Sequence, residues 1–199
     1  MQGSETSRAL WSVKMENVIL IAAVVSAAAV LLFAAAQYNG LVAARNRVKT
    51  QWAQVDVQLK RRADLIPNLV ETVKGYAKHE ESALTGVTAA RAKMLSAANP
   101  KAALTADGEL SSALQKVLAL REAYPELKAN ANFGQLSLQL TETEGKIAYA
   151  RQFYNDTVLI YMDKIQMFPG SVFAALFGFK EEDYLSATEQ ERQSVAVKF

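Results

Sequence analysis

The sequence has no cysteine, one histidine and four prolines in 199 residues. Without cysteine it has no disulfide framework, no cysteine-based zinc site and no iron–sulfur cluster. A single histidine excludes metal motifs that need paired imidazoles. Neither sign of charge is in large excess, because 22 basic and 20 acidic residues leave a net charge of only +2. That balance does not predict nucleic-acid binding. These absences favour a binding protein over an enzyme.

The apolar residues, by contrast, are concentrated in one run. Residues 18–36 contain a single polar side chain, Ser26. As a helix this run would be roughly 28 Å long, close to the thickness of a bilayer hydrocarbon core. Trp11 and Tyr38 lie beyond its two ends, where interfacial aromatic residues are expected. We predict a transmembrane anchor that includes Val18, Ile21, Val25, Leu32 and Ala36.

A cleaved signal peptide is the competing interpretation of this run. Lys14 would supply its basic region, and residues 34–36 form an Ala-Ala-Ala cleavage site before Gln37. The run is long for the apolar part of a signal peptide, which favours an uncleaved anchor.

The orientation of the anchor is weakly encoded. Two basic residues, Arg8 and Lys14, precede the run, and three follow it, namely Arg45, Arg47 and Lys49. The excess of one favours a cytoplasmic position for the C-terminal domain. The side of the membrane stays open.

After residue 40 the sequence predicts helix throughout, since apolar residues do not alternate with period two. An apolar seam from Val48 to Leu59 recurs at spacings of four and three. Two alternatives remain beyond it: one long helix kinks at Pro67, or a new helix starts at Asp64. Asn99–Pro100 is expected to end the second helical run.

Two more helices are predicted in the second half. The third is expected to start near Asp107, a good N-cap residue, and to be interrupted at Tyr124–Pro125. The fourth starts with a capping-box-like pair, Asn132 and Gln135, and has one packing face from Phe133 to Phe168. Four amphipathic segments with short joints predict an antiparallel helix bundle.

A search for catalytic patterns finds no assembled site. His79 belongs to neither a zinc-protease nor a di-iron pattern, and a solvated helix face explains it best. Glu142 and Glu144 point to different faces of their helix. A metal-dependent hydrolase remains an alternative only through scattered carboxylates such as Glu71, Glu144 and Asp156. We therefore expect no enzyme activity, no cofactor and no metal.

Two segments are candidates for interaction. A Phe-rich segment follows the fourth helix, and it either closes the end of the bundle or contacts the membrane or another subunit. A basic triplet in the first helix is solvated, faces a partner or touches anionic headgroups. The candidate interaction surface comprises Phe173, Leu176, Phe177, Phe179, Lys60, Arg61 and Arg62.

Several long motifs, in order, carry a resemblance to a known family. They are YNGLV with Arg45-Asn46, the stretch from Val55 to Glu80, REAYPELKANANF (Arg121 to Phe133), IAYARQFYNDTV (Ile147 to Val158) and FPGSVFAALFGF (Phe168 to Phe179). Together with Trp52, these motifs resemble the bacterial LemA family over nearly everything from Tyr38 to the C-terminus.

The resemblance implies an N-terminally anchored, up-and-down four-helix bundle. It implies no reaction and no catalytic residues, because the family has none established. It suggests a membrane-associated factor linked to envelope or membrane-protease regulation, with one branch of the family tied to magnetosome membranes. Some members carry a lipoprotein cysteine before the Tyr-Asn pair, but position 37 is glutamine here, so the apolar helix must serve as the anchor. Lipoprotein members display the bundle outside the inner membrane, which opposes the cytoplasmic orientation.

The predicted organisation is all-α: a transmembrane helix followed by an antiparallel up-and-down four-helix bundle with long helices. The predicted parts are a tail (1–17), the anchor (18–37), a LemA-like bundle (38–168) and a Phe-rich segment with a tail (169–199). The leading hypothesis is a non-enzymatic, single-pass scaffold that binds other membrane or envelope proteins, with a bundle that binds anionic lipid as an alternative. Small residues at Ala22, Ser26 and Ala29 allow self-association of the anchor.

Overall fold

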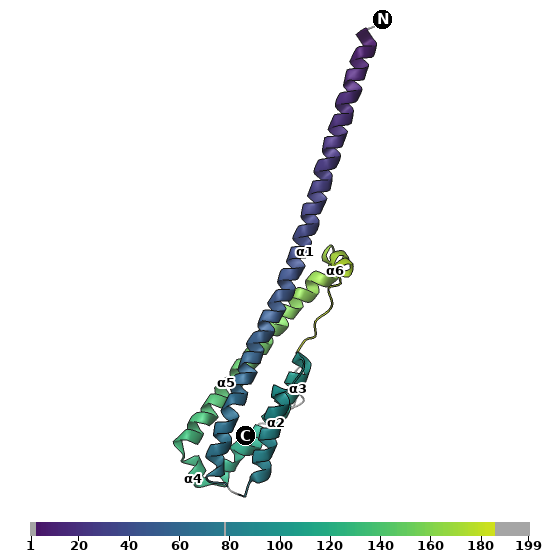
Figure 1. Cartoon of the computed structure of the whole chain (residues 1–199). Coiled ribbons are helices and arrows are strands. Elements are labelled where there is room, and N and C mark those ends of the chain that lie inside the picture. Colours follow the sequence, from purple (N-terminus) through teal and green to yellow (C-terminus); the bar gives the residue numbers. More distant parts are fainter. Residues whose placement is uncertain (1–2, 78, 186–199) are drawn as a thin grey trace, which may run out of the picture. The chain divides into compact units, whose positions relative to one another are not determined.

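The structure is a computed structural model that describes residues 3–77 and 79–185 (Figure 1). Every element within these residues is a helix, and they contain no strand, which confirms the prediction of an all-α chain. The elements are α1 (Gly3–Lys74), α2 (Glu81–Leu95), α3 (Pro100–Ala119), the 3-10 helix η1 (Leu120–Glu122), α4 (Pro125–Lys128), α5 (Ala131–Gln166) and α6 (Gly170–Phe177).

The described residues fall into two compact units. The first unit holds residues 3–45 together with Tyr161–Glu181, and the second unit holds Asn46–Ile160 together with residues 182–185. The first unit therefore contains the apolar part of α1, the end of α5 and all of α6. The second contains the rest of α1 and α5 with α2, α3 and α4.

α1 is one helix that continues through Pro67, which decides between the two alternatives left open by the sequence. A proline has no N–H to donate to the carbonyl four residues earlier, here that of Ala63. Arg91 on α2 donates its Nε–H to this carbonyl at 2.8 Å. The acceptor that Pro67 leaves unpaired is thus satisfied by a side chain from a neighbouring helix.

α3 begins seven residues earlier than predicted. Asn99 is its N-cap, with Oδ1 accepting a hydrogen bond from the Ala102 N–H at 2.9 Å, and Pro100 occupies the first turn. The prediction of a start near Asp107 was wrong, because Asn followed by Pro is itself a strong start signal. Asp107 lies inside the helix and is buried.

The break at Tyr124–Pro125 is confirmed. Tyr124 has φ −124° and ψ 88°, outside the α region, and Pro125 begins α4. The residue before a proline is disfavoured in the α region, which explains the break.

α5 is the long helix that the sequence predicts, with 36 residues. Its cap is Asn130 rather than Asn132, since Asn130 Oδ1 accepts a hydrogen bond from the Phe133 N–H at 2.9 Å. The predicted packing face is correct up to Ile165 and wrong at its last position. The helix ends at Gln166, and Phe168 is 84% exposed.

The core of the second unit includes most of the predicted apolar seams, and also Leu127 and Val158, which the sequence did not predict. α2 and α3 lie side by side, and the rings of Trp52 on α1 and Tyr154 on α5 meet edge-on with centroids 6.2 Å apart. The large side chains buried almost completely in this unit are Val55, Leu59, Ile66, Leu69, Val73, Val87, Leu110, Val117, Leu127, Ile147 and Val158.

Candidate functional site

The apolar part of α1 is the first candidate site. Within the described residues it is the one helical stretch long and apolar enough to cross a membrane, with a mean hydropathy of 2.9 over an 18-residue window that no protein atoms bury. The predicted transmembrane positions are exposed; they are Val18, Ile21, Val25, Leu32 and Ala36. A segment of this length and composition matches the hydrocarbon core of a bilayer.

An aromatic cluster forms where this apolar stretch ends, and all of it belongs to the first unit. Phe33 meets Phe173 of α6 edge-on, with ring centroids 6.2 Å apart. Tyr38 contacts two further rings, at 4.9 Å from Phe177 and 5.9 Å from Phe179. The guanidinium of Arg45 lies over the Phe179 ring at 4.9 Å from its centroid. Three of the predicted interaction residues therefore pack on α1.

Two glycines and one tyrosine fix α6 in this position. A Cβ on Gly170 would collide with the carbonyl oxygen of Lys164, so only glycine permits the close turn between α5 and α6. Gly178 ends α6 with φ +70°, a left-handed conformation that favours glycine. After α6, the Tyr161 hydroxyl donates to the Lys180 carbonyl at 2.7 Å. The chain therefore contacts α5 both before and after α6.

Much of the surface of α6 remains uncovered. Leu176 is 72% exposed, Val172 and Phe177 are also exposed, and Phe173 and Phe179 are half-buried. Of its eight residues only Gly170 and Ala174 are buried.

The basic triplet does not form one surface. Lys60 and Arg61 are exposed, as expected, but Arg62 is only 4% exposed. Three consecutive helical residues spread over about 200° of the helix circumference, so they cannot all face one side. Including Arg62 in an exposed interaction surface was therefore wrong. The anionic-lipid alternative loses one of its three charges.

Arg62 instead joins three helices of the second unit in a buried polar cluster. Its Nη1 donates to Asp107 Oδ1 on α3 at 2.9 Å. Its Nη2 donates to Ser111 Oγ at 3.0 Å and lies 2.9 Å from Glu144 Oε2 on α5. Burial raises the pKa of the Asp107 carboxyl above its ordinary value of 3.8; Arg62 opposes this rise, and Glu144 adds to it.

The sequence does contain a signal for this cluster. Arg62 lies between Leu59 and Ile66, and Asp107 between Ala103 and Leu110, at the three- and four-residue spacings of each apolar seam. Opposite charges at core positions of two helices predict a buried ion pair.

The scattered carboxylates do not converge. Glu144 pairs with Arg62, whereas Glu71 and Asp156 are exposed on their helices. Across residues 3–77 and 79–185, no group of three or more His, Cys, Asp or Glu side chains is arranged to hold a metal ion, and His79 is exposed. This arrangement lends no geometric support to a metal-dependent hydrolase.

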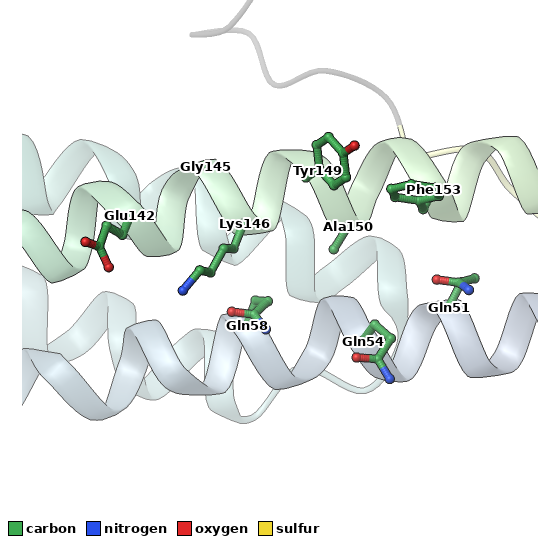
Figure 2. Close-up of a pocket in the computed structure, with 9 residues that line it drawn as sticks. All are labelled: Gln51, Gln54, Gln58, Glu142, Gly145, Lys146, Tyr149, Ala150 and Phe153. Atoms are coloured by element: carbon green, nitrogen blue, oxygen red, sulfur yellow. The ribbon is translucent and has the colours of Figure 1, made fainter.

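The second unit has an open groove of about 540 Å³ between α1 and α5 (Figure 2). The α1 wall carries three glutamines, and the α5 wall carries charged, small and aromatic side chains. Tyr149 is 65% exposed and its ring meets that of Phe153 edge-on at 5.0 Å. The Gln58 Oε1 is buried and has no hydrogen-bond partner. The residues that line the groove are Gln51, Gln54, Gln58, Glu142, Gly145, Lys146, Tyr149, Ala150 and Phe153.

The sequence analysis did not predict this groove. Tyr149 and Phe153 are four residues apart on one helix face, outside the predicted packing stripe, and that exposed aromatic pair is the signal that was available.

These features define the class of the protein: an all-helical chain with one long apolar N-terminal helix. Comparison with known proteins makes the assignment specific, because the LemA family model matches residues 51–199. The chain belongs to the LemA family, as its motifs predicted.

Curated relatives agree with this membership. The chain is 25% identical to magnetosome protein MamQ 2 of Paramagnetospirillum magneticum and 23% identical to magnetosome protein MamQ of Magnetospirillum gryphiswaldense, in each case over 84% of this chain and 71% of the relative. It is 26% identical to protein LemA of Metamycoplasma hominis, over 79% of this chain and 72% of that protein.

Proposed function

We propose that this protein is a non-enzymatic, single-pass protein of the bacterial inner membrane whose helical region is a protein-interaction or assembly scaffold at the membrane surface. Envelope or membrane-protease regulation is the setting that the family membership favours. The proposed parts are the tail (1–17), the anchor (18–37), the bundle (38–168) and the C-terminal segment (169–199).

The groove between α1 and α5 is the observation that carries this proposal. Exposed aromatic rings are typical of the centre of protein-binding surfaces, and polar side chains are typical of the rim around it. Tyr149 and Phe153 supply the rings, and the three glutamines of the α1 wall supply amide groups. The MamQ relatives, named as magnetosome proteins, fit a role in membrane-associated assembly.

We further propose that the helices of the second unit form an antiparallel up-and-down bundle. Two contacts between α1 and α5 support this topology. The Trp52 ring meets that of Tyr154, and Arg62 pairs with Glu144. Between these two contacts the residue number rises by ten on α1 and falls by ten on α5, so the two helices run in opposite directions. Contacts of α1 with α3, through Arg62 and Asp107, and with α2, through Arg91 and Ala63, bring the other helices to the same core.

Affinity capture of the intact, detergent-solubilised protein tests the scaffold. We expect the protein to retain a defined partner or a second copy of itself, and Tyr149→Glu to release it because a carboxylate replaces an aromatic ring in the groove. Leu159→Glu is the matched control, since Leu159 is also exposed on α5 but does not line the groove. A strictly monomeric protein with no reproducible partner would contradict the proposal, as would equal loss of binding in both variants.

A further inference from the structure

We propose that α6 is a second membrane contact, with its uncovered face embedded in the interfacial layer of the bilayer that the N-terminal helix crosses. This inference goes beyond the scaffold function, although it rests on the anchor that is part of that proposal. In this proposal lipid, and not a protein partner, covers the exposed face of α6.

The contacts of α6 place it at the level where the anchor leaves the membrane. Phe33 lies three residues before the end of the apolar run at Ala36, and Tyr38 lies two residues after it. At a rise of 1.5 Å per residue these two side chains bracket the end of the run within about 8 Å along the helix axis. Phe173 contacts the first and Phe177 the second. α6 lies beside α1 at this level (Figure 1). If the apolar run crosses the bilayer, α6 therefore lies at the boundary between hydrocarbon and headgroups.

The chemistry of this segment suits that boundary. Between Lys164 and Lys180 the chain has fifteen consecutive residues without a charge, 165–179. Its most exposed large apolar side chains are Phe168 at 84% and Leu176 at 72%. Helices that lie in the membrane interface carry residues such as Phe and Leu on their apolar face. Tyr38, whose ring contacts Phe177, is one of the two aromatic types that concentrate at the interface. An apolar helix surface beside a membrane span is continuous with the apolar surface of the span itself.

The position of α6 is built into the fold. The close approach of Gly170 to the Lys164 carbonyl, the left-handed Gly178 and the Tyr38 ring hold the helix against α1 and α5. With both flanks fixed, Leu176 and Phe168 stay exposed among the residues that the structure describes. Bilayer insertion covers them without a rearrangement of the protein.

The experiment uses the full chain in phosphatidylcholine vesicles. The natural sequence has no cysteine, so each of three variants, Val25→Cys, Leu176→Cys and Leu138→Cys, carries one environment-sensitive fluorophore. Leu138 is the matched control, because it is 60% exposed on α5 in the second unit. Quenching is measured with phosphatidylcholine that carries a nitroxide high on an acyl chain, and with aqueous iodide.

We expect the lipid quencher to act on the labels at Val25 and Leu176 several-fold more strongly than on the label at Leu138, and iodide to show the opposite order. Quenching at Leu176 that equals the value at Leu138 would overturn the inference while leaving the anchor intact. A label at Leu176 that is shielded from both quenchers would replace lipid with a protein partner and would also overturn it. Loss of lipid quenching at Val25 as well would refute the anchor, and with it the proposed function.

Discussion

Replacing Arg62 by alanine is the sharpest perturbation of the second unit. The guanidinium connects α1 to Asp107 on α3 and to Glu144 on α5. Asp107 is almost as buried as Arg62, whereas the Glu144 side chain is half exposed. The truncation therefore leaves one carboxylate in the core without its cation, and one at the surface in contact with water.

The magnitude follows from this difference in burial. Removing one partner of a buried ion pair costs about 3–5 kcal/mol, because the remaining charge is uncompensated. The Glu144 contact adds at most about 1 kcal/mol, since solvent screens it. For a chain of this size each kcal/mol lowers the melting temperature by about 2–4 °C, so a total loss of about 3–6 kcal/mol in Arg62→Ala should lower it by roughly 6–24 °C.

Thermal unfolding of the full chain in detergent, followed by circular dichroism, measures this effect. Arg61→Ala is the matched control: it removes the neighbouring, exposed guanidinium and should change the free energy of unfolding by no more than about 0.5 kcal/mol. The double substitution Arg62→Met with Asp107→Leu should recover most of the loss, because apolar replacements remove the buried charge altogether. Equal, small effects of Arg61→Ala and Arg62→Ala would refute the reasoning.

Three further predictions concern other parts of the chain. Arg91→Ala should lower the free energy of unfolding by about 1–3 kcal/mol, because it leaves the buried Ala63 carbonyl unpaired. The loss should be much smaller in a Pro67→Ala background, where residue 67 regains an N–H that can donate to this carbonyl. Additive effects of the two substitutions in denaturant titrations would disprove this coupling. Because burial raises the pKa of Asp107, the neutral carboxyl stabilises the fold; this contribution is present below pH 3.8 and is lost as pH rises through the raised pKa. The free energy of unfolding, measured against pH, should show this loss in the natural chain and not in Asp107→Asn. Gly170→Ala should displace α6, because a methyl group would overlap a main-chain carbonyl, and trypsin should then cleave faster after the neighbouring lysines; unchanged cleavage would contradict the tight turn.

Much of the fold was predictable because helical periodicity and apolar run length are local properties. The seam from Val48 to Leu59, the long α5 and the apolar run in α1 all depend on such patterns. Helix starts were less predictable, since Asn99 and Asn130 compete with nearby Asp107 and Asn132 as caps, and both residue types, Asn and Asp, cap well. The competition is decided by the packing of the whole unit.

Local spacing places Arg62 and Asp107 at core positions of their helices, but it does not specify which helices pack together. Whether Arg62 is solvated or buried depends on Asp107, 45 residues away. The continuity of α1 through Pro67 depends on Arg91, which lies 28 residues beyond the carbonyl that it satisfies. The Phe-rich segment was recognised as unusual, but its packing on Phe33 and Tyr38 requires α5 to return the chain to the end of the apolar run.

Site-specific photo-cross-linking in intact cells tests the scaffold claim most directly. A photoreactive amino acid replaces Tyr149 in the groove, or Gln115 on an exposed position of α3, in the full chain. We predict a discrete cross-linked product from position 149, with a second copy or one membrane or envelope protein as its identified partner, and none from position 115. Monomer alone from both positions, or the same diffuse products from both, would contradict a scaffold that binds through this groove.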